Sequence, residues 1–188
     1  MQITVVRHGE TKINYLKKIQ GSRTNEKLNV AGRKQIRNIA NKLLKDNAVF
    51  DLVMSSPLSR ALESASILNE TLKIDDKIII NMLFQERDFG YFEKMDIDEF
   101  YKLKSEKDID EYYESDDELL ARINYAALDI SNKYPNSNIL VAAHSQVIKS
   151  LLIIAGAKGY HFQSPIKNGE FFTFEIKDHK IKFVCSSK

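Results

Sequence analysis

The sequence predicts an α/β fold, built as a three-layer α/β/α sandwich around a mainly parallel sheet. Short apolar segments alternate along the chain with longer segments whose apolar residues recur at helical spacing. Strands that alternate with helices in this way form parallel sheets covered by helices on both faces. The length of 188 residues, 43% of them hydrophobic, fits one domain over residues 1–188 with a full-sized core.

The first half of the chain supplies three predicted strands and two helices. Ile3–Arg7 is an apolar run typical of a buried strand, and Asp51–Ser55 is the next one. Asn29 is a favourable N-cap for the amphipathic helix between them. Ser56, followed by a proline, predicts that the second helix begins directly after the second strand. Lys77–Ile80 is expected to form a third, short strand.

The second half continues the alternation and ends in a hairpin. Ser115–Glu118, with the sequence SDDE, is a capping box that opens a long helix. Asn138–Ala143 is the most apolar strand, so we place it at the centre of the sheet. The helix after it is expected to end near Gly156. Glu170–Ile176 and Lys180–Val184 are predicted to form the hairpin.

Composition limits the partners and the location that we expect. The net charge of +2 gives no general case for nucleic-acid binding. The single cysteine, Cys185, has no partner for an internal disulfide, and the chain opens without a leader of the secretory kind. The apolar run Leu151–Gly156 is too short to span a bilayer. We therefore expect a cytoplasmic protein that binds neither nucleic acid nor membrane.

Polar residues follow three of the predicted strands. The first strand ends in Arg7 and is followed by His8. Arg60 lies shortly after the second strand, and His144 and Ser145 follow the central one. Ligands in such folds bind outside the carboxyl ends of the strands, so these side chains should converge. Cationic groups in one small volume repel each other unless an anion lies between them. The guanidinium fork of arginine matches phosphate or carboxylate, which predicts an oxyanion site.

Several motifs around these residues resemble those of one family. The stretches RHGET, SSPLSRALESA and VAAHS resemble the three signatures of the histidine phosphatase superfamily, also called the phosphoglycerate mutase-like fold. QGSRTNEKLNVAGRKQ, FQERDFG and KNGEF resemble further stretches of that family, in the same order along the chain. The first of these has one extra residue and lacks the Asp and the Pro of the family pattern. The similarity runs over most of the chain.

The resemblance implies a nucleophile and a set of groups that hold the phosphoryl group. His8 would be the nucleophile and form a phosphohistidine, which requires a neutral imidazole. Arg7, Arg60 and His144 would clamp the oxygens of the transferring group. The neighbouring arginines would also keep His8 neutral, because like charge disfavours the imidazolium.

Glu86 matches the proton donor of the family. It would protonate the leaving oxygen and then deprotonate the water that attacks the phosphohistidine. A carboxyl group with this task needs a raised pKa, from burial or from a nearby negative phosphate. Asp88 and Glu93 are rivals for the role in the same loop.

The resemblance also implies residues that line the phosphate pocket, namely Asn14, Gln20 and Gly21. Ser145 stands where the family has glycine, so a side chain is added where backbone N–H groups approach the phosphate. This change bears on the choice of substrate. No cluster of Cys, His, Asp or Glu has the spacing of metal ligands, and a phosphohistidine route needs no metal, so we expect no metal and no cofactor.

Residues Tyr91–Glu118, here named the acidic segment, carry 12 Asp and Glu residues against 4 Lys, a net charge of −8. Such a run is either a solvated face or, as the resemblance implies at this position, a short lid over the site. Mutases of the superfamily carry longer insertions there with a basic pair, which is missing here. A negative lid repels a doubly anionic substrate, which favours a phosphatase over a mutase. The expected substrate is a small phosphomonoester with a neutral, cationic or aromatic leaving group.

The resulting expectation is a histidine acid-type phosphatase that acts without metal on a small phosphorylated metabolite, as a monomer or a homodimer. Three other functions stay open: mutase-type phosphoryl transfer, dephosphorylation of a phosphoprotein, and phosphate binding without catalysis. Phosphate release without an acceptor distinguishes the phosphatase from the mutase. The presence of both His8 and Glu86 argues against a non-catalytic module.

Overall fold

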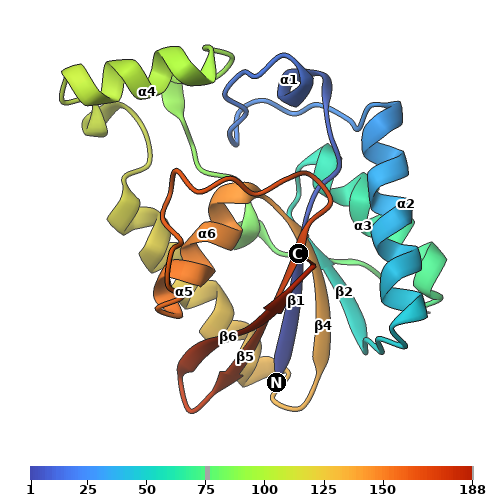
Figure 1. Cartoon of the computed structure of the whole chain (residues 1–188). Coiled ribbons are helices and arrows are strands. Elements are labelled where there is room, and N and C mark those ends of the chain that lie inside the picture. Colours follow the sequence, from blue (N-terminus) through green and yellow to red (C-terminus); the bar gives the residue numbers. More distant parts are fainter. Residues whose placement is uncertain (75–76, 188) are drawn as a thin grey trace.

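In the computed structural model the chain forms a six-stranded sheet between two layers of helices (Figure 1). The structure describes residues 1–74 and 77–187, so residues 75, 76 and 188 of the expected domain lie outside it. The strands are β1 (Gln2–Arg7), β2 (Leu52–Ser55), β3 (Ile79–Ile80), β4 (Asn138–Ala143), β5 (Phe171–Lys177) and β6 (Lys180–Ser186). Their order across the sheet is β3-β2-β4-β1-β5-β6. The first four pair in parallel, and β5 is antiparallel to both β1 and β6, so the predicted mainly parallel sheet is confirmed.

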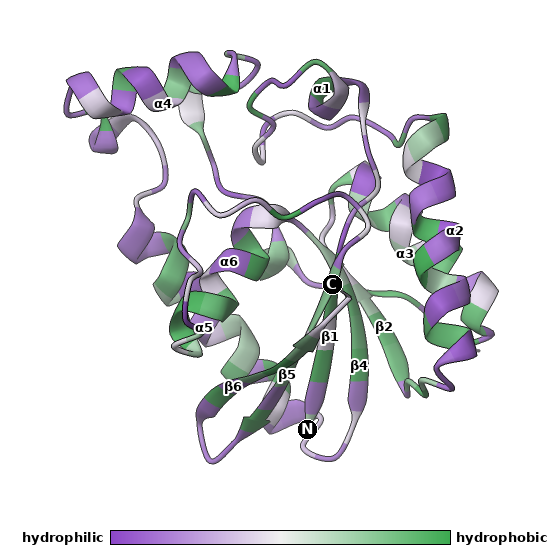
Figure 2. Ribbon diagram, viewed as in Figure 1, coloured by the Kyte–Doolittle hydropathy of each residue, from purple (hydrophilic) through white to green (hydrophobic). Residues whose placement is uncertain are grey.

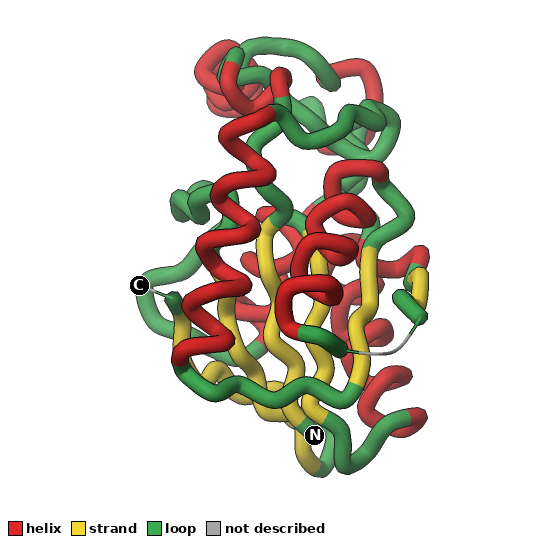
Figure 3. Tube along the Cα trace, turned by 90° about the vertical axis from the view of Figure 1, so that its right-hand side faces the viewer, coloured by secondary structure: helices red, strands yellow, loops and turns green. Residues whose placement is uncertain are grey.

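Two pairs of helices cover the sheet. Helices α2 (Val30–Lys45) and α3 (Ser59–Leu72) lie on one face, in front of the strands in Figure 3. Helices α5 (Asp116–Lys133) and α6 (Ser145–Ile154) lie on the other face (Figure 1). Because neighbouring residues of a strand point to opposite faces, Val5 packs with α5 and α6 whereas Val6 packs with α2 and α3. Figure 2 shows the apolar strands between these layers, and the α/β/α sandwich is confirmed.

The register of the sheet brings the ends of three strands together. Arg7 at the end of β1 lies opposite Ala143 at the end of β4, and Ser55 at the end of β2 lies opposite Ala142. Strand β4 lies between β1 and β2 and is the central strand that the sequence predicts. The residues that follow these strands therefore leave the sheet at one edge.

Local signals fix most helix starts. The side chain of Asn29 accepts from the backbone N–H of Gly32 at 2.7 Å, and the Ser115–Glu118 capping box is present. The start of α3 is different from the prediction. The helix begins at Ser59 with Leu58 as N-cap, so the start predicted at Ser56 is wrong. The backbone N–H of Ser56 still donates to Ala142 of β4, because the extended chain continues one residue past the end of β2.

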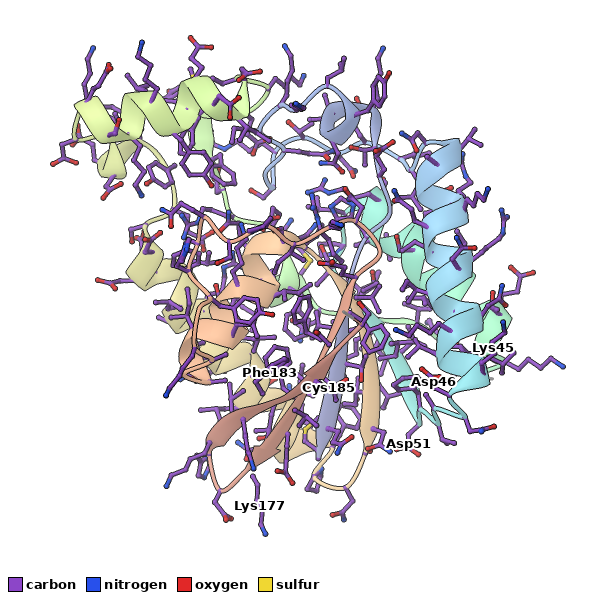
Figure 4. All side chains as sticks on the ribbon, in the orientation of Figure 1. Lys45, Asp46, Asp51, Lys177, Phe183 and Cys185 are labelled. Atoms are coloured by element: carbon purple, nitrogen blue, oxygen red, sulfur yellow. The ribbon has the colours of Figure 1, made fainter. Side chains whose placement is uncertain are left out.

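The acidic segment and the loop around α1 (Lys12–Tyr15) lie over the carboxyl ends of the strands (Figure 1). The acidic segment contains α4 (Ile97–Glu106), flanked by the short 3-10 helices Gly90–Phe92 and Asp110–Tyr112. Its aromatic and aliphatic side chains form a small core of their own with Ile19 and Phe89. The labelled side chains of Asp51 and Lys177 lie at the opposite end of the sheet (Figure 4).

Two findings bear on partners. Within residues 1–74 and 77–187, no helix combines the length and the apolar character that crossing a bilayer requires. Cys185 is a free and exposed thiol on β6.

Candidate active site

His8 lies at the edge of the sheet where β1 ends, and only 2% of it is exposed. Its Nδ1 lies 2.7 Å from the carbonyl oxygen of Gly9, and its Nε2 lies 3.2 Å from Nε of Arg60. A carbonyl accepts and a guanidinium donates, so these partners assign the proton to Nδ1 and leave a lone pair on Nε2. The hydrogen-bond pattern therefore leaves Nε2 without a proton, as the predicted role of His8 requires.

The surroundings of His8 keep its imidazole neutral. Its pKa is lowered well below the ordinary value of 6.5, first by burial and then by the positive charges of Arg60 and Arg7. The hydrogen bond to Gly9 acts in the opposite direction and does not cancel these effects. Nucleophilic attack requires a neutral imidazole whose attacking nitrogen carries no proton.

His144, the N-cap residue of α6, packs against His8. The centroids of the two rings are 5.1 Å apart, with an angle of 62° between the ring planes. Nε2 of His144 lies 2.8 Å from Oγ of Ser56, which also accepts from the N–H of Leu58. We assign the Ser56 hydroxyl as donor to Nε2, because this gives the buried hydroxyl hydrogen an acceptor. The proton of His144 then lies on Nδ1, which has no hydrogen-bond partner among the described residues.

Arg60 in the first turn of α3 is fully buried. Besides donating to His8, it donates to the carbonyl oxygens of Thr24 at 2.8 Å and Gly21 at 3.1 Å. Burial lowers its pKa to about 10, so it remains charged at neutral pH. Three of its five N–H groups are used in these bonds, and two remain for an anion.

Arg7 is the second guanidinium of the site. It donates through a terminal nitrogen to the carbonyl oxygen of Ile166, and its buried Nε has no partner among the described residues. Burial lowers its pKa, while the charges of Glu86 and Glu170 raise it. A buried donor without an acceptor is costly, and an anion in the site would satisfy it.

Glu86 is the buried carboxyl group of the site, with 6% of the residue exposed. Its Oε1 accepts from the backbone N–H of Arg87 at 3.0 Å and from that of Gln146, in the first turn of α6, at 3.2 Å. Its pKa is raised, mainly by burial, although these two hydrogen bonds and the charges of Arg60 and Arg7 lower it. The raised pKa suits a group that has to carry a proton.

The two rival carboxylates have other partners. Asp88 is partly exposed and accepts from the guanidinium of Arg23 at 3.0 and 3.1 Å. Oε1 of Glu93 accepts from the backbone N–H of Arg23 at 2.8 Å. Glu86 is the carboxylate that lies against the α6 N-terminus and lines the same cavity as His8.

Of the four predicted phosphate-binding residues, three line a cavity together with His8, and the fourth forms a hydrogen bond with Arg60. Asn14, Gln20 and Ser145 line a cavity with His8, and Nε2 of Gln20 is buried without a partner in the described part of the chain. Gly21 instead accepts from Arg60 through its carbonyl oxygen. A Cβ at Gly21 would lie 2.6 Å from the carbonyl oxygen of Arg87, so only glycine fits there.

This cavity, here named the His8 cavity, has a volume of about 320 Å³. Its lining combines His8, Arg7 and Glu86 with residues from the α1 loop, α4, α6 and the loop before β5. The lining residues are Arg7, His8, Asn14, Lys18, Ile19, Gln20, Glu86, Phe89, Ile97, Tyr101, Ser145, Gln146, Lys149 and 163–166.

Sequence reasoning missed three residues at this site. Lys149 and Tyr101 line the His8 cavity. Asn168 donates from Nδ2 to the carbonyl oxygen of His8 at 3.0 Å and to Oδ1 of Asn14 at 3.1 Å. It therefore links the loop before β5 to the segment that follows β1. The signal for Lys149 was a single charge in the otherwise apolar helix α6, and that for Asn168 was the quoted KNGEF stretch.

The acidic side chains lie elsewhere. None of the described Asp or Glu residues of the acidic segment lines the His8 cavity, to which the segment contributes Ile97 and Tyr101. Four of them line a separate cavity of about 730 Å³, which shares Glu86 with the His8 cavity. The acidic side chains of the segment therefore make no direct contact with a substrate in the His8 cavity, and any repulsion of a doubly anionic substrate acts at longer range.

In the described ranges, no group of three or more His, Cys, Asp and Glu side chains is arranged to hold a metal ion.

Comparison with known proteins places this chain in a family. Residues 3–187 match the family model of the histidine phosphatase superfamily (branch 1). The chain belongs to this superfamily. It is 34% identical to the uncharacterized phosphatase PhoE of Bacillus subtilis over 188 aligned residues, which cover 95% of this chain and 94% of that protein. The match supports a phosphatase activity.

Two solved structures show the same fold. A variant of phosphoserine phosphatase from Entamoeba histolytica, in complex with phosphoserine, has a TM-score of 0.82 at 23% identity and covers 100% of this chain and 96% of that one. Phosphoglycerate mutase from Bacillus anthracis has a TM-score of 0.83 at 20% identity, with 98% of this chain and 91% of that one covered.

Proposed function

We propose that this protein is a histidine acid-type phosphatase, a phosphoric monoester hydrolase that acts on a small phosphorylated metabolite through a phosphohistidine at His8. One observation carries the proposal. Nε2 of His8 holds a lone pair at the edge of a cavity that also contains the unpartnered buried donors of Arg7 and Gln20. A neutral nucleophile beside unsatisfied donors fits the transfer of a phosphoryl group.

In the first step, Nε2 of His8 forms a bond to phosphorus while the bond between phosphorus and the leaving oxygen breaks. The Nε–H of Arg60 then donates its hydrogen bond to a phosphoryl oxygen instead of to Nε2 of His8. Arg7 donates to the phosphoryl oxygens through its Nε–H, and His144 donates through its Nδ1–H. The hydrogen bond from Nδ1 of His8 to the carbonyl oxygen of Gly9 stabilises the positive charge that develops on the imidazole. Glu86 transfers its proton to the leaving oxygen, which departs as a neutral alcohol.

In the second step, the carboxylate of Glu86 removes a proton from water. The water oxygen attacks phosphorus, the bond between phosphorus and Nε2 breaks, and inorganic phosphate leaves. His8 returns to the neutral form with its proton on Nδ1. Glu86 is protonated again and ready for the next cycle.

The size of the His8 cavity supports a small substrate. A volume of about 320 Å³ is at the low end of ligand pockets, which span roughly 300–1,000 Å³. A cavity of this size suits a metabolite better than a phosphorylated side chain on a folded protein. The acidic segment would act as a lid on this cavity through Ile97 and Tyr101.

The test is release of inorganic phosphate from a panel of small phosphomonoesters, with no acceptor added and with a metal chelator present. We expect turnover that the chelator does not change. Transfer of the phosphoryl group to an added acceptor, without release of inorganic phosphate, would support a mutase, and binding without any transfer would support a non-catalytic module. Turnover that is lost on metal removal would contradict the proposed chemistry.

A further inference from the structure

Arg122 and Glu114 form an ion pair that the proposed reaction does not use. Arg122 lies in the second turn of α5, and Glu114 lies just before Ser115, the N-cap of that helix. Nε of Arg122 donates to Oε1 of Glu114 at 2.7 Å, and Nη2 donates to Oε2 at 2.8 Å. The two side chains are only 21% and 15% exposed. Two parallel hydrogen bonds of this kind fix the geometry of both side chains.

Arg122 also holds the backbone that leads into Glu86. Its Nη1 donates to the carbonyl oxygen of Leu83 at 2.5 Å and to that of Gln85 at 3.1 Å. Together with the two bonds to Glu114, four of the five N–H groups of the guanidinium are used. The guanidinium presents these donors in one rigid plane, so it fixes the two carbonyls relative to α5.

Glu114 holds the backbone on the other side of Glu86. Its Oε2 accepts from the backbone N–H of Asp88 at 3.1 Å, and its own N–H donates to the carbonyl oxygen of Asp88 at 2.8 Å. Between these fixed points lies the N–H of Arg87, which donates to Oε1 of Glu86 at 3.0 Å. The place of that N–H, and with it the place of the carboxyl group, therefore depends on the Arg122–Glu114 pair.

The Arg122–Glu114 pair does not reach the proposed substrate site. Neither residue lines the His8 cavity, whereas both line the cavity of about 730 Å³ that shares Glu86 with it. The pair can thus affect the reaction through the position of Glu86 or through charge. Charge has to be tested separately, because Arg122 is one of the charges that lower the pKa of His144.

We propose that the Arg122–Glu114 pair positions Glu86, by holding the loop of residues 83–88 so that the carboxyl group can protonate the leaving oxygen. This inference rests on the proposed function. Both members of the pair are positioning residues, since neither touches the substrate. The effect on rate is expected to be large, because a misplacement of about 1 Å in a catalytic group can cost about 100-fold.

The experiment compares phenyl phosphate with p-nitrophenyl phosphate, which differ in one nitro group. Phenolate is the more basic leaving group, so the hydrolysis of phenyl phosphate depends more strongly on the acid. The value of kcat/KM covers the reaction up to departure of the leaving group, so the second step does not enter it. A smaller folded fraction lowers both values equally. The ratio of the two kcat/KM values, phenyl over p-nitrophenyl, therefore measures the action of the acid.

Three variants test the pair. Arg122→Met should lower the ratio by at least about fivefold, which is part of the roughly 100-fold or more that a general acid contributes. Glu114→Gln loses the ion pair and should lower the ratio as well, and it decides the question if thermal unfolding shows that Arg122→Met does not fold. Arg122→Lys keeps the charge but loses the fork that reaches two carbonyls and a carboxylate, so the ratio should stay low.

The matched control is a second arginine–glutamate pair, which lies between α2 and α3 on the opposite face of the sheet. Nε of Arg33 donates to Oε1 of Glu63 at 2.6 Å, and Oε2 of Glu63 accepts from the backbone N–H of Leu28 at 3.0 Å. This pair also ties a loop to a helix, but it has no contact with the loop of residues 83–88. Arg33→Met should therefore leave the ratio unchanged.

A double variant shows whether the pair acts through Glu86. In the Glu86→Gln background the acid is already absent, so the addition of Arg122→Met should not lower the ratio further. A further decrease would overturn the inference, because the pair would then act on the reaction by another route. A wild-type ratio in Arg122→Lys would also overturn it, because the effect would then be one of charge.

The outcomes separate this inference from the proposed function. If Glu86→Gln lowers the ratio while the folded Arg122 and Glu114 variants lose activity equally on both esters, the inference fails and the phosphatase proposal stands. The pair would then only hold the acidic segment. A wild type that hydrolyses neither ester, or a Glu86→Gln variant with an unchanged ratio, contradicts the proposed function itself.

Discussion

The Nε–H of Arg60 donates to Nε2 of His8 across 3.2 Å, so a guanidinium covers the nitrogen that attacks in the proposed reaction. The same side chain holds the carbonyl oxygens of Gly21 and Thr24. Arg60 therefore fixes both the histidine and the loop of residues 21–24. In the proposed reaction, an entering phosphoryl group would accept the Nε–H of Arg60 and so free the lone pair of Nε2.

Replacing Arg60 should impair both catalysis and stability. Arg60→Lys keeps a charge but loses the planar fork that reaches three acceptors. We expect kcat/KM to fall by at least about 100-fold, and the free energy of unfolding to fall by about 1–3 kcal/mol. Denaturant unfolding and phosphate release measure the two effects. Arg33→Lys is the control, because its ion pair with Glu63 is partly exposed and should contribute little.

Glu86→Gln should show which group protonates the leaving oxygen. The variant has no proton to transfer, so esters of poorly acidic alcohols should lose at least about 100-fold in rate. The rate of the first step with p-nitrophenyl phosphate should fall much less, because its leaving group needs no proton. The comparison of product bursts and steady-state rates for the two substrates measures this difference.

Asp88→Asn is the matched control for Glu86→Gln. Asp88 is partly exposed and paired with Arg23, so its loss should change the rate by less than about twofold. A large loss in Asp88→Asn together with a small loss in Glu86→Gln would transfer the role of the acid to Asp88.

The pH dependence of kcat/KM should be bell-shaped. The rate rises as His8 loses its proton, which happens well below 6.5 because its pKa is lowered. It falls as Glu86 loses its proton, which happens above 4.5 because its pKa is raised. The ionisation of the substrate is common to the wild type and Glu86→Gln, so the variant should lose only the alkaline limb. An unchanged alkaline limb in Glu86→Gln would refute the assignment of Glu86.

Gly32 should tolerate no side chain, although it lies within a helix. A Cβ there would lie 2.2 Å from the carbonyl oxygen of Glu10, in the segment that follows His8. Glycine to alanine in a helix usually stabilises by about 0.5–1 kcal/mol. We expect Gly32→Ala instead to destabilise by about 2 kcal/mol and to reduce activity. Lys34→Ala in the same turn is exposed and should stay within about 0.5 kcal/mol of the wild type.

Features that depend on local chemistry could be predicted from the sequence. Asn29 and the Ser115–Glu118 box satisfy backbone groups within the same helix turn, so their signals are complete in a few residues. The apolar run of β4 indicated its central place. The convergence of His8, Arg60 and His144 followed from the parallel order of the strands.

Features that depend on tertiary contacts could not be predicted. Ser56 followed by proline is a good helix start in isolation, yet its N–H pairs with β4 and its hydroxyl with His144. The charge sum of the acidic segment does not say which cavity its side chains line. Lys149 lies in an apolar helix, and only the packing of α6 shows that it reaches the His8 cavity.

The most direct test of the central claim is to trap the intermediate. The protein is mixed with a ³²P-labelled phosphomonoester, quenched in alkali within one turnover, digested and sequenced by mass spectrometry. A phosphohistidine is labile in acid and survives alkali, and we expect it on His8 in the wild type and at no site in His8→Ala. Label on another residue, or full turnover by His8→Ala, would contradict the account.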